Sequence, residues 1–285
     1  MAVYKRGYEP YDGPLTPERL RFLVIARAAY RRLFESRILM GFLVICYIVP
    51  LVSAVLIYLP HNAAAGELFN FRKLIPIDGT FFYRYMTQQG MLAFLMTGFL
   101  GPGLVAPDIA NNALPLYFCR PFSRGEYVLG KMSVLAILLS AITWIPGLLL
   151  FGFATYLEGP AWGAANWFIA VGLLAGSLAW IVTLCFLALA MSAWVKWRIA
   201  AGALIFGIFF VGAGFGEAMN HGLGIRLGRL VNLGAVIEAV WHDMFRLASV
   251  RDLPSGAAWF TLAAFCGLCY WLMAKKLRAY HVERS

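Results

Sequence analysis

The chain has 285 residues, of which 61% are hydrophobic and 13% charged, and its mean hydropathy is +0.73. A soluble domain of this length needs more polar surface, so the composition excludes that class and predicts an integral membrane protein. The 24 Lys and Arg residues exceed the 14 Asp and Glu residues. Because most of the basic residues flank apolar segments, they indicate a membrane surface as the partner and not nucleic acid.

Residues 1–37 are predicted to form a cytoplasmic segment that ends in an amphipathic helix. Thr16, Pro17 and Glu18 are typical of a helix start, because they supply a hydroxyl cap, a proline and an acid near the positive helix end. Apolar side chains then recur on one face: Phe22, Ala26, Ala29 and Leu33. Arginines occupy the opposite side: Arg21, Arg27, Arg31 and Arg32. We expect this helix to lie flat at the inner membrane boundary, with a plain juxtamembrane anchor as the alternative.

Six windows lack Asp, Glu, Lys, Arg and His and reach roughly the 20 residues that a helix needs to cross about 30 Å of hydrocarbon. They are residues 38–59, 88–107, 132–157, 161–195, 199–216 and 253–274. The sequence therefore predicts an all-α domain of six transmembrane helices over residues 38–275 and a cytoplasmic tail over 276–285. Gly101 and Pro102 predict a kink or an end in the second span, and Pro146 predicts a kink in the third.

The distribution of Lys and Arg predicts the orientation. With the N-terminus inside, the cytoplasmic segments hold 17 of these residues and the external loops hold 7. The positive-inside rule then places both termini in the cytoplasm and residues 217–252 outside. In that external loop, Val240 and Trp241 share one helical face opposite Glu238 and His242, which predicts an amphipathic helix on the outer surface or dipping into it.

Candidate catalytic and ligand-binding residues are sparse. The spacing of Gly125, Gly130 and Lys131 imitates a phosphate-binding loop, but Met132 replaces the hydroxyl residue that would hold magnesium. We therefore expect no nucleotide site on this chain. Glu238 and His242 are two metal-ligand types without a third, so we expect a solvated helix face there and not a metal site.

Polar residues within the apolar windows are mostly hydroxyls. They include Thr97, Ser133, Ser140, Thr143, Ser177 and Thr183. With no acid inside a span, the sequence favours an amphipathic or lipid-like cargo over a bare ion. The alternative is that the cargo passes between subunits, so that one chain supplies only half of the lining. Asp108 follows the second window directly, and we interpret it as a cap on the next helix. The CxxC pair Cys266 and Cys269 lies in a span and is expected to pack as small apolar residues.

Residues 108–131 form the one long polar and aromatic segment between apolar runs. Pro115 breaks helices, the pair Arg120-Pro121 stiffens the backbone, and Ser123 is a favoured cap for a helix that begins after it. These residues predict a short ordered cytoplasmic element at the ends of two spans.

This segment resembles the signature between the second and third membrane helices of ABC transporter type 2 permeases. The similarity rests on the leucines at 114 and 116 and on four pairs: Arg120-Pro121, Ser123-Arg124, Glu126-Tyr127 and Gly130-Lys131. The sequence differs from the signature at Cys119, where serine is usual, and at Asn112-Ala113, where Gly-Thr is common. Residues 8–37 are also similar to the amphipathic lead-in of some members of this family.

The resemblance implies the membrane subunit of an exporter in a bacterial cytoplasmic (inner) membrane. It implies separate ABC ATPase subunits that hold ATP and Mg, and a second permease copy that is identical or different; it implies no cofactor on this chain. The residues expected to couple to the ATPase are Tyr117, Arg120, Pro121, Phe122, Ser123, Arg124, Glu126, Tyr127 and Lys131. The N-terminal helix would rest on the same partner. The alternative is a non-transporting scaffold that anchors an ATPase assembly, and a membrane enzyme ranks third because it lacks a catalytic constellation.

Overall fold

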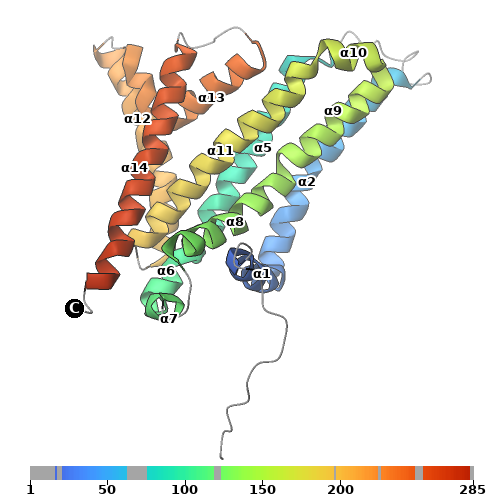
Figure 1. Cartoon of the computed structure of the whole chain (residues 1–285). Coiled ribbons are helices and arrows are strands. Elements are labelled where there is room, and N and C mark those ends of the chain that lie inside the picture. The colour runs from blue at the N-terminus through green and yellow to red at the C-terminus, as the bar shows by residue number, and fades with distance from the viewer. Residues whose placement is uncertain are drawn as a thin grey trace, which may run out of the picture.

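A computed structural model of the chain describes residues 17, 21–62, 76–118, 123–195, 197–223, 226–247 and 253–282. These residues form helices joined by short turns, and no strand occurs among them (Figure 1). The α-helices are α1 (Arg21–Phe34), α2 (Arg37–Tyr58), α5 (Gly79–Leu100), α6 (Pro102–Ala110), α7 (Leu114–Phe118), α8 (Arg124–Ile142), α9 (Trp144–Glu158), α10 (Pro160–Ala165), α11 (Trp167–Trp194), α12 (Arg198–Leu223), α13 (Leu233–Met244) and α14 (Ser255–Val282). The described residues also include the 3₁₀ turns η2 (Leu59–His61), after α2, and η3 (Arg226–Val231), before α13.

In this part of the chain, six helical segments are long and apolar enough to cross a membrane, as predicted. They are Arg37–His61, Gly79–Ala110, Arg124–Glu158, Trp167–Trp194, Arg198–Asn220 and Ser255–Lys276. The protein is therefore a multi-pass membrane protein. The second span begins at Gly79, earlier than the predicted residue 88. The Asp78 side chain caps the helix by accepting a hydrogen bond from the Phe81 N–H (3.0 Å). The charged residue Arg84 ended the apolar window in the sequence, but the helix continues through it.

Helix α11 forms the centre of the bundle. It packs against α5, α6, α8, α9, α12, α13 and α14. The most apolar window of its span is 67% buried, whereas those of the α2, α12 and α14 spans are 22% buried, so these three helices lie at the periphery of the bundle. Their exposed apolar side chains can contact lipid tails, or another protein chain, without a free-energy penalty.

Two spans are broken where glycine and proline predicted breaks. α5 ends at Leu100 and α6 starts at Pro102, and the hydroxyl of Ser192 on α11 bonds to the first turn of α6, next to this break. The third span breaks at Thr143, between α8 and α9. Tyrosine hydroxyls from other spans donate to the carbonyls there: Tyr85 to Thr143 (3.0 Å) and Tyr47 to Ala141 (2.9 Å).

Helix α13 dips into the bundle instead of lying on its surface. It packs against α11, α12 and α14. Trp241 donates from Nε1 to the Gly176 carbonyl (3.1 Å), and His242 is buried with its ring 4.4 Å from that of Tyr83. A solvated polar face was thus the wrong interpretation for His242. Glycine at position 176 lets the indole of Trp241 approach the backbone of α11, so this small residue serves packing within the chain.

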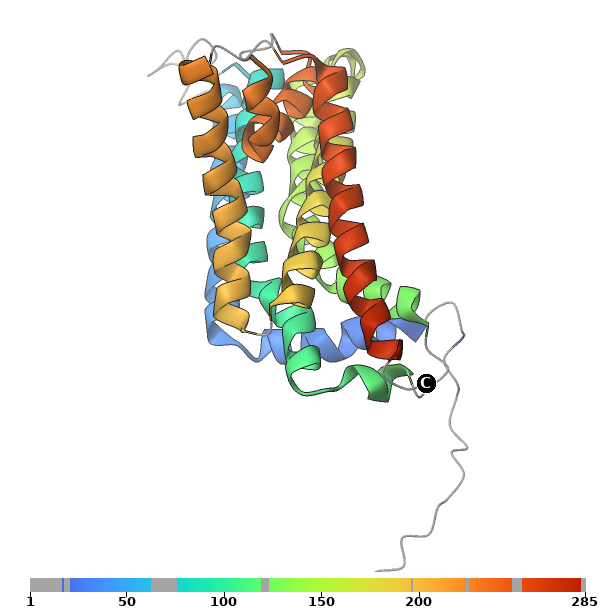
Figure 2. The same ribbon diagram turned by 90° about the vertical axis from the view of Figure 1, so that its left-hand side faces the viewer.

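The two ends of the bundle differ. α1, α6, α7 and the C-terminal part of α14 lie at one end, and α10 and α13 lie at the other (Figures 1 and 2). α1 runs crosswise to the spans, as Figure 2 shows. The predicted helix start at residues 16–18 falls largely outside the described residues, in which α1 begins at Arg21.

Candidate functional site: the α6–α7–α8 element and α1

Where the structure describes it, the segment 108–131 lies mostly in three helices. α6 and α7 occupy most of its first half, and α8 begins at Arg124. Three residues predicted to couple to the ATPase, Arg120, Pro121 and Phe122, lie outside the described residues, as does Cys119. The element is therefore anchored by the helices on both sides of them.

The turn between α6 and α7 depends on Asn112. Its φ is 51°, a left-handed conformation that glycine adopts most readily and asparagine next. The N–H of Asn112 donates to the Ile109 carbonyl (3.2 Å), and the N–H of Ala113 donates to that of Asp108 (2.8 Å), which is a Schellman motif. The difference from the family signature at position 112, asparagine for glycine, thus preserves the backbone that the turn requires.

Helix α8 starts with a complete capping box, as Ser123 predicted. The Ser123 hydroxyl accepts from the Glu126 N–H (3.2 Å), and a Glu126 carboxylate oxygen accepts from the Ser123 N–H (2.6 Å). Such a box satisfies two otherwise unpaired backbone donors and fixes the direction in which the chain enters the helix. Glu126 therefore has a structural task that its predicted contact with a partner did not include.

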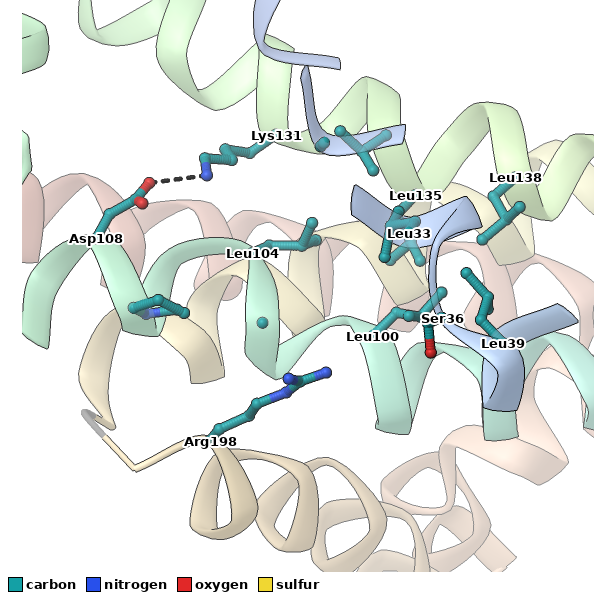
Figure 3. Close-up of a pocket in the computed structure, with 14 residues that line it drawn as sticks. Leu33, Ser36, Leu39, Leu100, Leu104, Asp108, Lys131, Leu135, Leu138 and Arg198 are labelled. Carbon is teal, nitrogen blue, oxygen red and sulfur yellow. Dashed lines mark ion pairs between the residues drawn. The ribbon is translucent and has the colours of Figure 1, made fainter. Parts of the chain in front are cut away.

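Asp108 joins α6 to α8. Its carboxylate lies 2.8 Å from Nζ of Lys131 and accepts a hydrogen bond from the Tyr127 hydroxyl (2.7 Å) (Figure 3). The side chains of Lys131 and Asp108 are only 11% and 16% exposed. Each charge of this enclosed pair depends on the other, because removal of one side chain leaves the other charge poorly solvated. Instead of capping the next helix, Asp108 fixes α6 against α8.

Aromatic packing extends this joint to α7. The Tyr117 ring lies 5.4 Å from the Tyr127 ring, and Tyr127 is 1% exposed. Tyr127 and Lys131 thus face the interior of the element. The first turn of α8 is more accessible: Ser123 and Gly125 are exposed, and Arg124 is half-buried.

Helix α1 packs on the opposite side of α8. The Tyr30 hydroxyl donates to the Val134 carbonyl (2.6 Å), and burial raises the pKa of this phenol to about 12. A Cβ added at Gly130 would lie 2.8 Å from the Phe22 carbonyl oxygen, so glycine is required for this approach. Ala26 is buried on the same face, and Arg27 is exposed. The side chains of Arg21, Arg31 and Arg32 lie outside the described residues.

The described residues hold no group of three or more His, Cys, Asp or Glu side chains placed to bind a metal ion. Glu238 accepts a hydrogen bond from the Tyr83 hydroxyl (3.1 Å). The segment that imitates a phosphate loop is helical throughout, and its lysine, Lys131, is paired with Asp108.

The hydroxyls within the spans mainly bond to their own helices. Four of them donate to a carbonyl one turn earlier: Thr97 to Ala93 (2.8 Å), Ser133 to Gly130 (2.9 Å), Thr143 to Leu139 (2.7 Å) and Thr183 to Ala179 (2.8 Å). Hydroxyls satisfied in this way can remain in an apolar bundle without lining a pathway.

No protein-family model and no curated protein matches this chain. The candidate site combines a capped helix start, a buried charge pair and a crossing helix, all at one end of the bundle (Figure 2). Sequence reasoning missed the Asp108–Lys131 pair. An acid at the end of one span and a lysine early in the next were the available signal.

Proposed function

We propose that this chain is the permease subunit of an ATP-binding cassette transporter, working as a dimer with separate ATPase subunits. The observation that carries the proposal is the α6–α7–α8 element, which bears the family-like motif and is fixed to two spans by the Asp108–Lys131 pair. The chain supplies no nucleotide chemistry in this proposal. ATP and Mg act on the partner.

The element has the mechanical properties that coupling requires. A push on the first turn of α8 passes directly into the third span, because the capping box ties that turn to the helix. The Asp108 carboxylate transmits the same push to α6 and the second span. α1 moves with α8 because the two helices are in close contact at Gly130. ATP-driven closure of the ATPases would in this way tilt two spans together.

The orientation is part of the proposal. We place the end with α1, α6 and α7 in the cytoplasm of a bacterial cell, with α1 in the headgroup region of the inner membrane. The 17 to 7 distribution of Lys and Arg supports this placement. The exposed Arg27 is positioned on α1 for contact with headgroups or with the partner.

We propose an amphipathic or lipid-like cargo because the six apolar windows contain no acidic residue. Two cavities, of about 350 Å³ near Lys131 and about 460 Å³ near Arg84, share no lining residue. Because the two cavities are separate, we propose that the cargo passes between two copies of the chain.

The second candidate function, a scaffold that anchors an ATPase without moving a cargo, also agrees with two separate cavities. A variant that stops transport but keeps the ATPase bound separates the two functions.

The test uses two substitutions of Glu126 in the tagged full-length chain. Glu126→Gln keeps an acceptor for the Ser123 N–H and removes only the charge, whereas Glu126→Lys removes both. If the carboxylate contacts the ATPase, Glu126→Gln lowers the amount of co-purifying ABC ATPase, or its coupled hydrolysis, while the unfolding midpoint stays unchanged. Wild-type assembly and coupled hydrolysis in both Glu126→Lys and Pro121→Ala would remove the element from the coupling role.

A further inference from the structure

A cavity of about 350 Å³ lies beside the Asp108–Lys131 pair (Figure 3). Residues from α1, α2, α5, α6 and α8 line it together with Arg198, the first residue of α12. The volume falls within the roughly 300–1,000 Å³ that small-molecule sites occupy. Six of the lining residues are leucines: Leu33, Leu39, Leu100, Leu104, Leu135 and Leu138.

The lining separates apolar from charged groups. In Figure 3, Leu33, Leu39, Leu135 and Leu138 gather at one end, and the Asp108–Lys131 pair lies toward the other. The guanidinium of Arg198 points toward the space below Leu104. Arg198 is exposed, so it marks the side on which the cavity opens.

Arg198 is the uncompensated charge of this lining. Lys131 is neutralised by Asp108 at 2.8 Å, whereas the described residues contain no ion pair that includes Arg198. The first turn of α12 has no acidic residue. The positive end of a helix also disfavours a cation there, so its own helix gives Arg198 no stabilising partner.

We propose that this cavity binds an anionic amphiphile, with one acyl chain among the leucines and a phosphate or carboxylate head on Arg198. A lipid tail is about as apolar as leucine, so transfer of the chain from the bilayer is nearly neutral and contributes shape selection only. The head gives the selectivity, because guanidinium binds an oxyanion through two parallel hydrogen bonds. A resident phospholipid and an amphipathic cargo share this chemistry.

This inference does not depend on the proposed transport function, because the isolated full-length chain is sufficient to test it. The chain is placed in nanodiscs of equal parts phosphatidylglycerol and phosphatidylcholine with matched acyl chains. After gentle extraction, native mass spectrometry measures the ratio of the two lipids that stay bound. We expect phosphatidylglycerol to be enriched, and Arg198→Gln to lower the enrichment by about tenfold, the loss expected for one charge-assisted interaction.

The charge-matched control is Arg37→Gln. Arg37 begins α2 near the same end of the bundle, is exposed and does not line the cavity. Its substitution should leave the enrichment unchanged. An equal loss in Arg37→Gln and Arg198→Gln would mean general attraction of headgroups to a basic surface, and would overturn the proposed site. No enrichment in the wild-type chain would overturn it as well.

A second variant tests the apolar part. Ser36 lines the cavity, and at the start of α2 its side chain makes no capping hydrogen bond, so Ser36→Phe fills space without removing a cap. We expect this variant to retain less of both lipids. Unchanged retention would show that no chain enters the cavity. The last experiment adds inorganic phosphate at millimolar concentration as a competitor. Full displacement of the lipid by phosphate would show a simple anion site and refute the proposal that the cavity binds an amphiphile.

Discussion

Ser192 provides the sharpest stability prediction, because its hydroxyl caps the first turn of α6 at the break that follows α5. Its Oγ accepts from the N–H groups of Val105 (3.0 Å) and Ala106 (2.8 Å) and donates to the Pro102 carbonyl (3.0 Å). Ser192 is fully buried, so water cannot replace these bonds. It acts as a helix cap supplied by a neighbouring helix.

The magnitude follows from counting the donors that Ser192→Ala leaves unpaired. Ala106 still has the Pro102 carbonyl one turn earlier as a helical acceptor. Val105 makes no hydrogen bond to the Gly101 carbonyl, its helical acceptor, which bonds Leu104 in a tighter turn. One buried N–H therefore loses its partner, which costs about 1–3 kcal/mol. We expect the free energy of unfolding to fall by about 2 kcal/mol.

Equilibrium unfolding in mixed micelles, followed by tryptophan fluorescence, measures this loss. The matched control is Ser133→Ala, because the Ser133 hydroxyl bonds only to the Gly130 carbonyl of its own helix (2.9 Å) and should change stability by less than about 0.5 kcal/mol. If the two variants are equally stable, the Ser192 hydroxyl does not stabilise the start of α6, and the reasoning is refuted.

Three further outcomes are expected. Lys131→Met should destabilise by about 1–3 kcal/mol by leaving the Asp108 carboxylate poorly solvated, and Asp108→Leu in the same chain should restore part of the loss; purely additive losses in a double-mutant cycle would contradict the pair. The purified chain should bind no nucleotide, and ATP hydrolysis that Lys131→Ala abolishes would defeat this expectation. With Cys119 as the only cysteine, an impermeant thiol reagent should label it only after the cells are opened, and labelling in intact cells would reverse the orientation.

The spans were predictable from sequence because their signal is one-dimensional. A run without charges long enough to cross hydrocarbon identified all six, and Gly101, Pro102 and Pro146 located the two broken spans. The cap at Ser123 was also predicted, whereas the part of Glu126 in the capping box was not, although the two residues lie three apart. The beginning of α5 was missed because Arg84 ended the apolar window, although an arginine near a span end is compatible with a helix.

The joints of the site could not be read in the same way. Asp108 and Lys131 come from different helices, so their pairing depends on how α6 turns back toward α8. Ser192 looks like any serine in an apolar run until the position of α6 is known. α13 has the same period whether it lies on a surface or inside a bundle. The burial of His242 against Tyr83 therefore required the tertiary structure.

A photocrosslinking measurement tests the central claim, contact between the first turn of α8 and an ATPase, most directly. Gly125 is exposed, and a Cβ added there meets nothing closer than the Ser123 hydroxyl at 3.9 Å, so we choose this position for benzoylphenylalanine. The control position is Tyr156, which is 83% exposed near the C-terminal end of α9. In native membranes, irradiation should join position 125, and not position 156, to a polypeptide that carries an ABC ATP-binding domain. Crosslinks from position 125 to lipid alone, or equal ATPase capture at both positions, would contradict the account.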